Sequence, residues 1–104
     1  MTVVSLTAIH AKPGASWEHI QQTLKKGNEV VRRAGAENVT AMVGIAAGTA
    51  TATVTILATS PDWTSYGKVQ DAMLADPEMQ ALMGDPNSPV ATWDTYVLQT
   101  IPDM

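Results

Sequence analysis

NVTAMVGIAAGTATATVTILATSPD, residues 38–62, is the segment from which the architecture of this chain can be worked out. Residues Asn38–Ala47 and Thr49–Thr59 are rich in strand-favouring residues, and Gly48 between them predicts a tight antiparallel hairpin. In the second strand threonines alternate with Ala, Val and Ile, which predicts one apolar face and one half-polar face. Ser60-Pro61-Asp62 then predicts a helix start, with a serine cap and a proline in the first turn.

A strand and a helix are expected before this hairpin. Thr2–Lys12 is rich in β-branched residues and ends at Pro13-Gly14, which is a strong stop signal for a strand. Ser16 is the expected N-cap of a helix that ends at Gly35. Along this helix an apolar stripe recurs at helical spacing, and it is formed by Trp17, Ile20, Leu24, Val31 and Ala34.

A helix and a strand are expected after the hairpin. Apolar residues continue at helical spacing over Pro61–Met83. Asp76-Pro77 is expected to interrupt this helix, because a proline ring removes a donor and disfavours helical backbone at the residue before it. Gly84–Pro89 is a loop by composition, and Val90–Ile101 is the last predicted strand.

This order of elements is the split β-α-β pattern of a ferredoxin-like α+β sandwich, β-α-β-β-α-β. We therefore expect one domain over residues 1–104, with a four-stranded antiparallel sheet and two helices on one face. The first strand carries apolar residues on both sides, with Val4, Leu6 and Ala8 on one and Val3 and Ile9 on the other. An apolar face that the helices leave uncovered predicts a partner, and a second copy, forming a dimeric α/β barrel, is the simplest one.

The composition excludes several classes of partner and site. The 104 residues carry a formal net charge of −4, which is unlike a nucleic-acid-binding domain. The absence of cysteine excludes disulfides and thiolate ligands, and no spacing of histidines or acids predicts a metal site. No apolar run has the length of about 20 residues that a membrane span requires, and the first residues lack the basic start of a signal peptide. We therefore expect no membrane partner and a cytoplasmic location.

Three features together resemble the dimeric α/β-barrel superfamily: Lys12-Pro13-Gly14 after the first strand, Trp63 near the start of the second helix, and the run Ala75–Leu82. Within it the chain is similar to small NIPSNAP-type proteins and antibiotic biosynthesis monooxygenases. This resemblance implies a pocket in each subunit between sheet and helices, where cofactor-free monooxygenases oxidise phenolic polycycles. Trp63 matches the tryptophan that those enzymes use, whereas the positions of their asparagine and tyrosine hold Thr59 and Val69.

The resemblance and the residue chemistry together give seven candidate site residues. His10, Trp63 and Tyr66 are the candidate catalytic residues; His10 is either a proton acceptor facing the pocket or a surface or interface histidine. Trp93 and Tyr96 lie on opposite faces of the last strand, so one of them is expected to reach the pocket or the dimer barrel, and the sequence leaves open which one. The candidate substrate-binding residues are Thr59, Met42, Trp93 and Tyr96.

Two functions remain open from the sequence. One is an enzyme with an apolar aromatic pocket for a small molecule, either a cofactor-free monooxygenase or a cyclase or isomerase of secondary metabolism. The other is a non-catalytic homodimer that binds a ligand or a partner. Heme-degrading members of the superfamily use a histidine on the second helix, and no histidine lies in Pro61–Met83, so no cofactor is expected.

Overall fold

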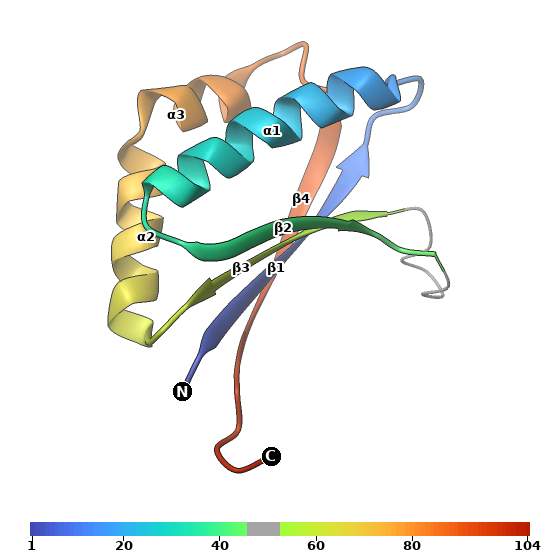
Figure 1. Cartoon of the computed structure of the whole chain (residues 1–104). Helices are drawn as coiled ribbons and strands as arrows, with labels where there is room; N and C mark the ends of the chain where they lie inside the picture. Colours follow the sequence, from blue (N-terminus) through green and yellow to red (C-terminus); the bar gives the residue numbers. More distant parts are fainter. Residues whose placement is uncertain (46–52) are drawn as a thin grey trace.

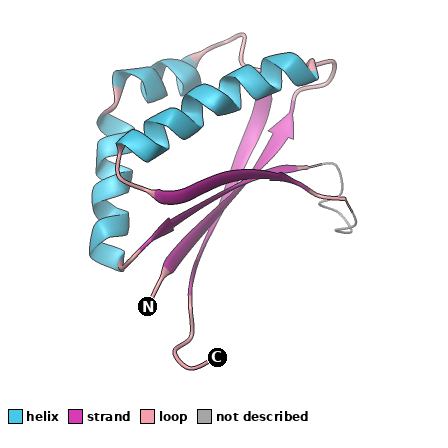
Figure 2. Ribbon diagram, viewed as in Figure 1, coloured by secondary structure: helices cyan, strands magenta, loops and turns pink. Residues whose placement is uncertain are grey.

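The computed structural model describes residues 1–45 and 53–104, and it has the expected order of elements (Figures 1 and 2). The turn predicted at Gly48 lies outside the described residues. The elements are β1 (Val3–Ala11), α1 (Trp17–Arg33), β2 (Glu37–Val43), β3 (Val54–Ser60), α2 (Trp63–Ala75), α3 (Pro77–Gly84) and β4 (Val90–Gln99).

The four strands form one antiparallel sheet in the order β2-β3-β1-β4. The register places Leu6 of β1 between Leu57 of β3 and Tyr96 of β4. All three helices lie on the same side of this sheet, and its other side is open (Figure 2). The expected ferredoxin-like α+β fold is therefore confirmed.

Local capping explains where α1 and α2 begin and end. The Ser16 side chain accepts a hydrogen bond from the His19 backbone N–H at 3.1 Å, as expected for the N-cap of α1. Gly35 follows the helix with a φ of +110°, a conformation that glycine adopts most easily. The predicted cap at Ser60 is wrong: Asp62 caps α2 by accepting from the Ser65 N–H at 2.7 Å. Ser60 still pairs with Val3 in the sheet, so the strand ends one residue later than the sequence suggested.

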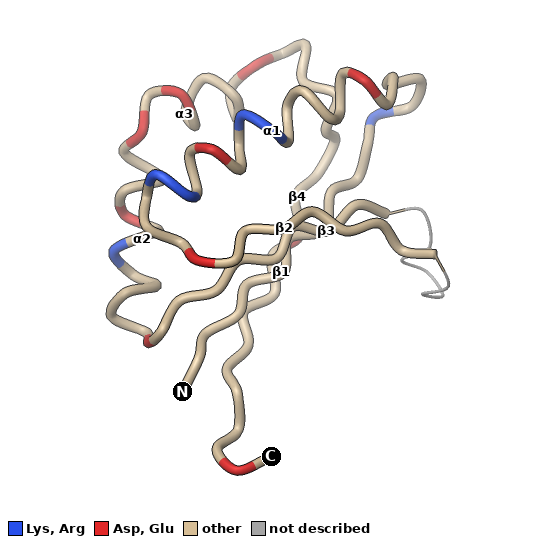
Figure 3. Tube along the Cα trace, in the orientation of Figure 1, with Lys and Arg blue, Asp and Glu red and all other residues tan. Residues whose placement is uncertain are grey.

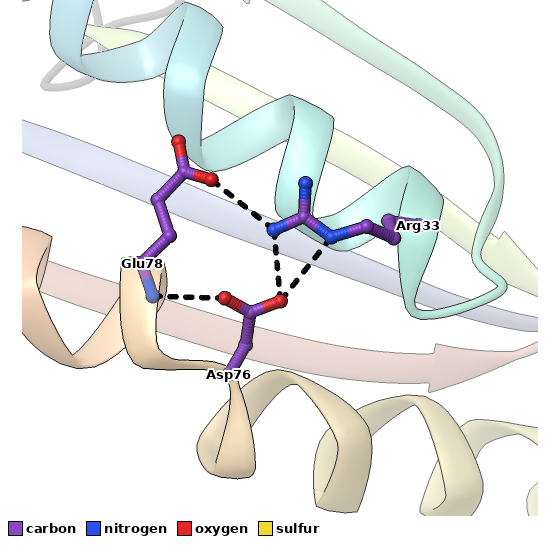
Figure 4. A network of polar contacts seen from close by, with 3 residues as sticks. All are labelled: Arg33, Asp76 and Glu78. Atoms are coloured by element: carbon purple, nitrogen blue, oxygen red, sulfur yellow. Dashed lines mark hydrogen bonds and ion pairs between the residues drawn. The ribbon is translucent and has the colours of Figure 1, made fainter.

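The break at Asp76-Pro77 divides the second predicted helix into α2 and α3. Asp76 ends α2 and caps α3, because its Oδ1 accepts a hydrogen bond from the Glu78 N–H at 2.9 Å. From the end of α1, the Arg33 guanidinium donates to Asp76 Oδ2 at 2.8 Å and to Glu78 Oε2 at 3.2 Å (Figure 4). The hydrogen bond from Arg33 lowers the pKa of the Asp76 carboxyl below its ordinary value. This network joins α1 to the corner between α2 and α3.

The core lies between α1 and the helix-side face of the sheet. Buried residues alternate cleanly along β3, where Val54, Ile56 and Ala58 face the helices. From α1, Ile20 and Leu24 belong to the same core cluster, and Val30 on the same helix is fully buried. Four members of the expected apolar stripes are exposed instead, so these stripes are narrower than the sequence pattern predicted. They are Trp17 on α1 and, within Pro61–Met83, Trp63, Leu74 and Met83.

Candidate functional site

Two contiguous cavities lie between the helix layer and the sheet. We call them the methionine chamber, of about 150 Å³, and the tyrosine chamber, of about 340 Å³. Five residues line both chambers and make them neighbours: Thr7, Val31, Ile56, Met73 and Thr95. The chambers therefore form one elongated space over the middle of the sheet.

The methionine chamber is almost entirely apolar. It lies between α1, α3 and the strands, and Asn28 is its one amide-bearing residue. Its walls beyond the shared residues are Leu24, Gly27, Met79, Leu82, Met83 and Trp93. Methionine side chains are flexible and polarizable, so a wall built from them can adapt to ligands of different shapes.

The tyrosine chamber carries more polar groups. It lies between α2 and the strands, where Ser5, Ser60, Tyr66 and Gln70 contribute hydroxyl and amide groups beside Ala36, Ala58, Val69 and Val97. Tyr66 and Gln70 are one helical turn apart on α2 and are only partly buried. Within the described part of the chain, neither side chain has a hydrogen-bond partner, so both are available to a bound molecule.

A pair of threonines lies on the part of the sheet that lines both chambers, and we call this part the floor. Thr7 of β1 and Thr95 of β4 are directly opposite each other in the sheet, and their hydroxyl oxygens are 3.0 Å apart. One hydroxyl of the pair donates to the other, and the acceptor keeps a proton that a ligand could receive. The sequence reasoning missed this pair, because strand alternation could show only that Thr95 shares a face with Trp93.

Trp63 and Tyr66 touch each other at the N-terminal end of α2. Their rings meet edge to face, with centroids 5.7 Å apart and an interplanar angle of 82°. Tyr66 lines the tyrosine chamber, but Trp63 is not among its lining residues. The Trp63 ring is 46% exposed, and its Nε1–H donates to Gln99 Oε1 at 2.7 Å. Trp63 therefore joins α2 to the end of β4 and supports Tyr66 from outside the chamber.

His10 lies on the opposite face of the sheet from the helices. Its neighbour Ile9 belongs to the core, and successive residues of a strand point to opposite faces. His10 Nε2 lies 2.9 Å from Asp94 Oδ2 on the adjacent strand β4. The structure therefore does not bring His10 together with Trp63 and Tyr66, and it gives the histidine an acidic partner that local sequence could not reveal.

The four candidate substrate-binding residues divide between the two faces. Trp93 lines the methionine chamber, and so it is the member of the Trp93/Tyr96 pair that reaches the helix side. Tyr96, Met42 and Thr59 lie on the other face by their register with Leu6, Thr55 and Val4. Thr59 Oγ1 accepts a hydrogen bond from Asn38 Nδ2 at 2.9 Å and donates to the Glu37 carbonyl. The roles of these residues stay predictions.

We call the face away from the helices the outer face. It carries the apolar residues Val4, Leu6, Ala8, Met42, Leu57, Tyr96 and Leu98, together with threonines and the His10–Asp94 pair. Charged residues are concentrated on the helices and loops, and the strands hold few of them (Figure 3). No helix covers the outer face in the described chain, and Met42, Tyr96 and Leu98 are largely exposed there.

Residues 1–45 and 53–104 contain neither a membrane-spanning helix nor a cluster of potential metal ligands. Over these ranges no helix is both long and apolar enough to cross a membrane. The same ranges hold no cluster of three or more His, Asp or Glu side chains placed to bind a metal ion.

Comparison with known proteins identifies the fold. No protein-family profile matches the chain, and no curated protein matches its sequence. A NIPSNAP family protein from Agrobacterium tumefaciens matches with a TM-score of 0.75 and 10% identity, over 99% of this chain and 96% of that one. The chain has a ferredoxin-like fold similar to that of NIPSNAP-type proteins.

Two other solved structures have this NIPSNAP-like fold in common with the chain. A dabb family protein with a ferredoxin-like fold from Mesorhizobium loti has a TM-score of 0.70 at 11% identity, over 96% and 97% of the two chains. A dimeric ferredoxin-like protein of unknown function from Thermobifida fusca has a TM-score of 0.67 at 10% identity, over 96% and 92%. At such identities the likeness concerns the fold, and the expected similarity to antibiotic biosynthesis monooxygenases in activity stays a prediction.

Proposed function

We propose that this protein binds a small, largely apolar molecule between its helices and its sheet. The observation that carries the proposal is the elongated space formed by the methionine and tyrosine chambers, of about 150 and about 340 Å³. Ligand sites typically occupy about 300–1,000 Å³ and combine apolar walls with a few convergent polar groups. The two chambers together have this size and this composition.

Binding can be tested with N-phenyl-1-naphthylamine, an uncharged dye whose fluorescence rises in apolar surroundings. The native protein is expected to bind it saturably, at one molecule per chain. Val31→Phe places a ring where the chambers meet and should abolish binding. Leu74→Phe, at an exposed position on the same helix as Met73, is the matched control and should bind normally. Equal binding by both variants would place the dye elsewhere and refute the proposal.

We also propose that the outer face packs against a second copy of the chain. In the described chain no helix covers this face, and its side chains Met42, Tyr96 and Leu98 are exposed, which is typical of a surface that binds a partner. The Thermobifida fusca protein of this fold is itself described as dimeric.

Catalysis is a second candidate function, and the edge-to-face pair of Trp63 and Tyr66 favours it. A phenol in the tyrosine chamber would lie beside Tyr66, with apolar side chains such as Ala58 and Val69 on the chamber walls. A cofactor-free oxygenase would consume oxygen in the presence of anthrone-like phenols, and Trp63→Phe would lower the rate of this oxygen consumption. A cyclase or isomerase would convert its substrate without oxygen. Oxygen consumption unchanged by Trp63→Phe, or none with bound anthrone, would refute the oxygenase version and leave the binding function intact.

A further inference from the structure

The lining of the two chambers contains no ionic group within the described residues. None of the side chains that form the walls or the floor belongs to Asp, Glu, Lys, Arg or His. On the helices, Arg33 forms hydrogen bonds with Asp76 and Glu78, so these three charges pair with one another. A charged ligand entering the chambers would lose water without gaining a counter-ion, and this disfavours the binding of ions.

Polar and apolar groups are separated along the space. Hydroxyl and amide groups concentrate at the α2 end, where Tyr66 and Gln70 lack partners among the described residues. The α3 end is built from Met79, Leu82 and Met83. A molecule that fills both chambers would therefore have one hydrogen-bonding end and one apolar body.

We infer that the ligand is an uncharged amphiphile, with a hydroxyl or carbonyl group bound by Gln70 and Tyr66 and its apolar body in the methionine chamber. This inference rests on the proposed binding function and adds the chemical class of the ligand. Gln70 is the specificity-determining residue: its amide can donate to a carbonyl or accept from a hydroxyl, so it accommodates either neutral group. The Thr7–Thr95 pair offers one further proton midway along the floor.

The test displaces bound N-phenyl-1-naphthylamine with three molecules that differ only at one end: decan-1-ol, decanoate and decylamine, at neutral pH. Decan-1-ol is expected to displace the dye at a concentration at least tenfold lower than either ion, because neither ion finds a counter-charge. Displacement by either ion at the same concentration as the alcohol would overturn the inference. If the dye itself does not bind, the proposed function has failed instead, so the two failures are distinguishable.

Substitution of Gln70 tests whether this residue binds the polar end of the ligand. Gln70→Leu should lower the ratio of the affinity for decan-1-ol to the affinity for the dye about fivefold, which is the usual effect of losing one hydrogen bond. Gln22→Leu makes the same exchange at an exposed position of α1 that lines neither chamber, and it should leave this ratio unchanged. Since Gln70 has no partner in the described chain, its replacement is not expected to unfold the protein, and circular dichroism checks this. An unchanged ratio in a folded Gln70→Leu would refute the assignment of the polar end.

Discussion

Leu98 lies on the outer face near the end of β4, and replacing it with aspartate is expected to dissociate the proposed dimer. In the single chain 49% of its surface is exposed, so the substitution should not disturb the folded monomer. Complete burial of a leucine side chain contributes about 1.5–3 kcal/mol. About half of this, roughly 1 kcal/mol for each copy, is available when the exposed half is covered by a partner.

The twofold symmetry of a homodimer doubles this loss. Two copies of Leu98→Asp remove about 2 kcal/mol, which raises the dissociation constant about thirtyfold. Two unpaired carboxylates buried in the interface raise it further. Leu74→Asp is the control, since Leu74 is 58% exposed but lies on α2.

Sedimentation equilibrium at micromolar concentration measures the effect. The native protein and Leu74→Asp should sediment at twice the chain mass of 11.0 kDa, and Leu98→Asp should approach the mass of one chain. A native protein that sediments as a monomer would refute the dimer. A Leu98→Asp protein that remains as dimeric as Leu74→Asp would show that the interface is not the outer face.

Three further predictions concern stability, measured by urea unfolding. Val30→Ala should lower the free energy of unfolding by about 2 kcal/mol because Val30 is fully buried. Val43→Ala, at a half-exposed position, is the control and should change this free energy by less than about 0.5 kcal/mol. Equal effects of the two substitutions would contradict the assigned core. Gly35→Ala should cost about 1–2 kcal/mol, because Gly35 has a positive φ, and an unchanged stability would mean that this backbone conformation is not required. Arg33 lowers the pKa of Asp76, so their pairing stabilises the fold above the ordinary carboxyl pKa and is lost as the pH falls through the lowered one. Arg33→Gln should therefore be less stable than the native protein at neutral pH and similar to it in acid, and a difference independent of pH would contradict this.

The fold could be predicted from the sequence because its signals are local. Ser16, Gly35 and Asp76-Pro77 each mark a helix boundary as expected. Ser16 and Asp76 act through their side-chain oxygens, and Gly35 acts through its positive φ. The alternation along β3 predicted its buried face correctly over Val54–Ser60. The start of α2 was misplaced because Ser60 and Asp62 are both good N-caps, and the choice between them depends on a strand pairing that local sequence does not contain.

The candidate site was harder to predict because it depends on which face of each strand the helices cover. Alternation shows that Trp93 and Tyr96 point in opposite directions, but only the packed helices show that Trp93 is the inner one. His10 and Asp94, like Thr7 and Thr95, meet through strand pairing between distant parts of the chain. Gln70 was not predicted, although one signal could have found it: it lies one helical turn after Tyr66, on the same face of the helix.

The six methionines allow the most direct test of binding between helices and sheet. Met73, Met79 and Met83 line the methionine chamber, Met42 lies on the outer face, and Met1 and Met104 lie near the chain ends. The NMR signals of methyl-labelled methionines, assigned by single Met→Leu substitutions, would be followed while N-phenyl-1-naphthylamine is added. We predict saturable shifts of the Met73, Met79 and Met83 signals and none at Met42. A shift at Met42 with the three chamber signals unchanged would contradict a site between the helices and the sheet.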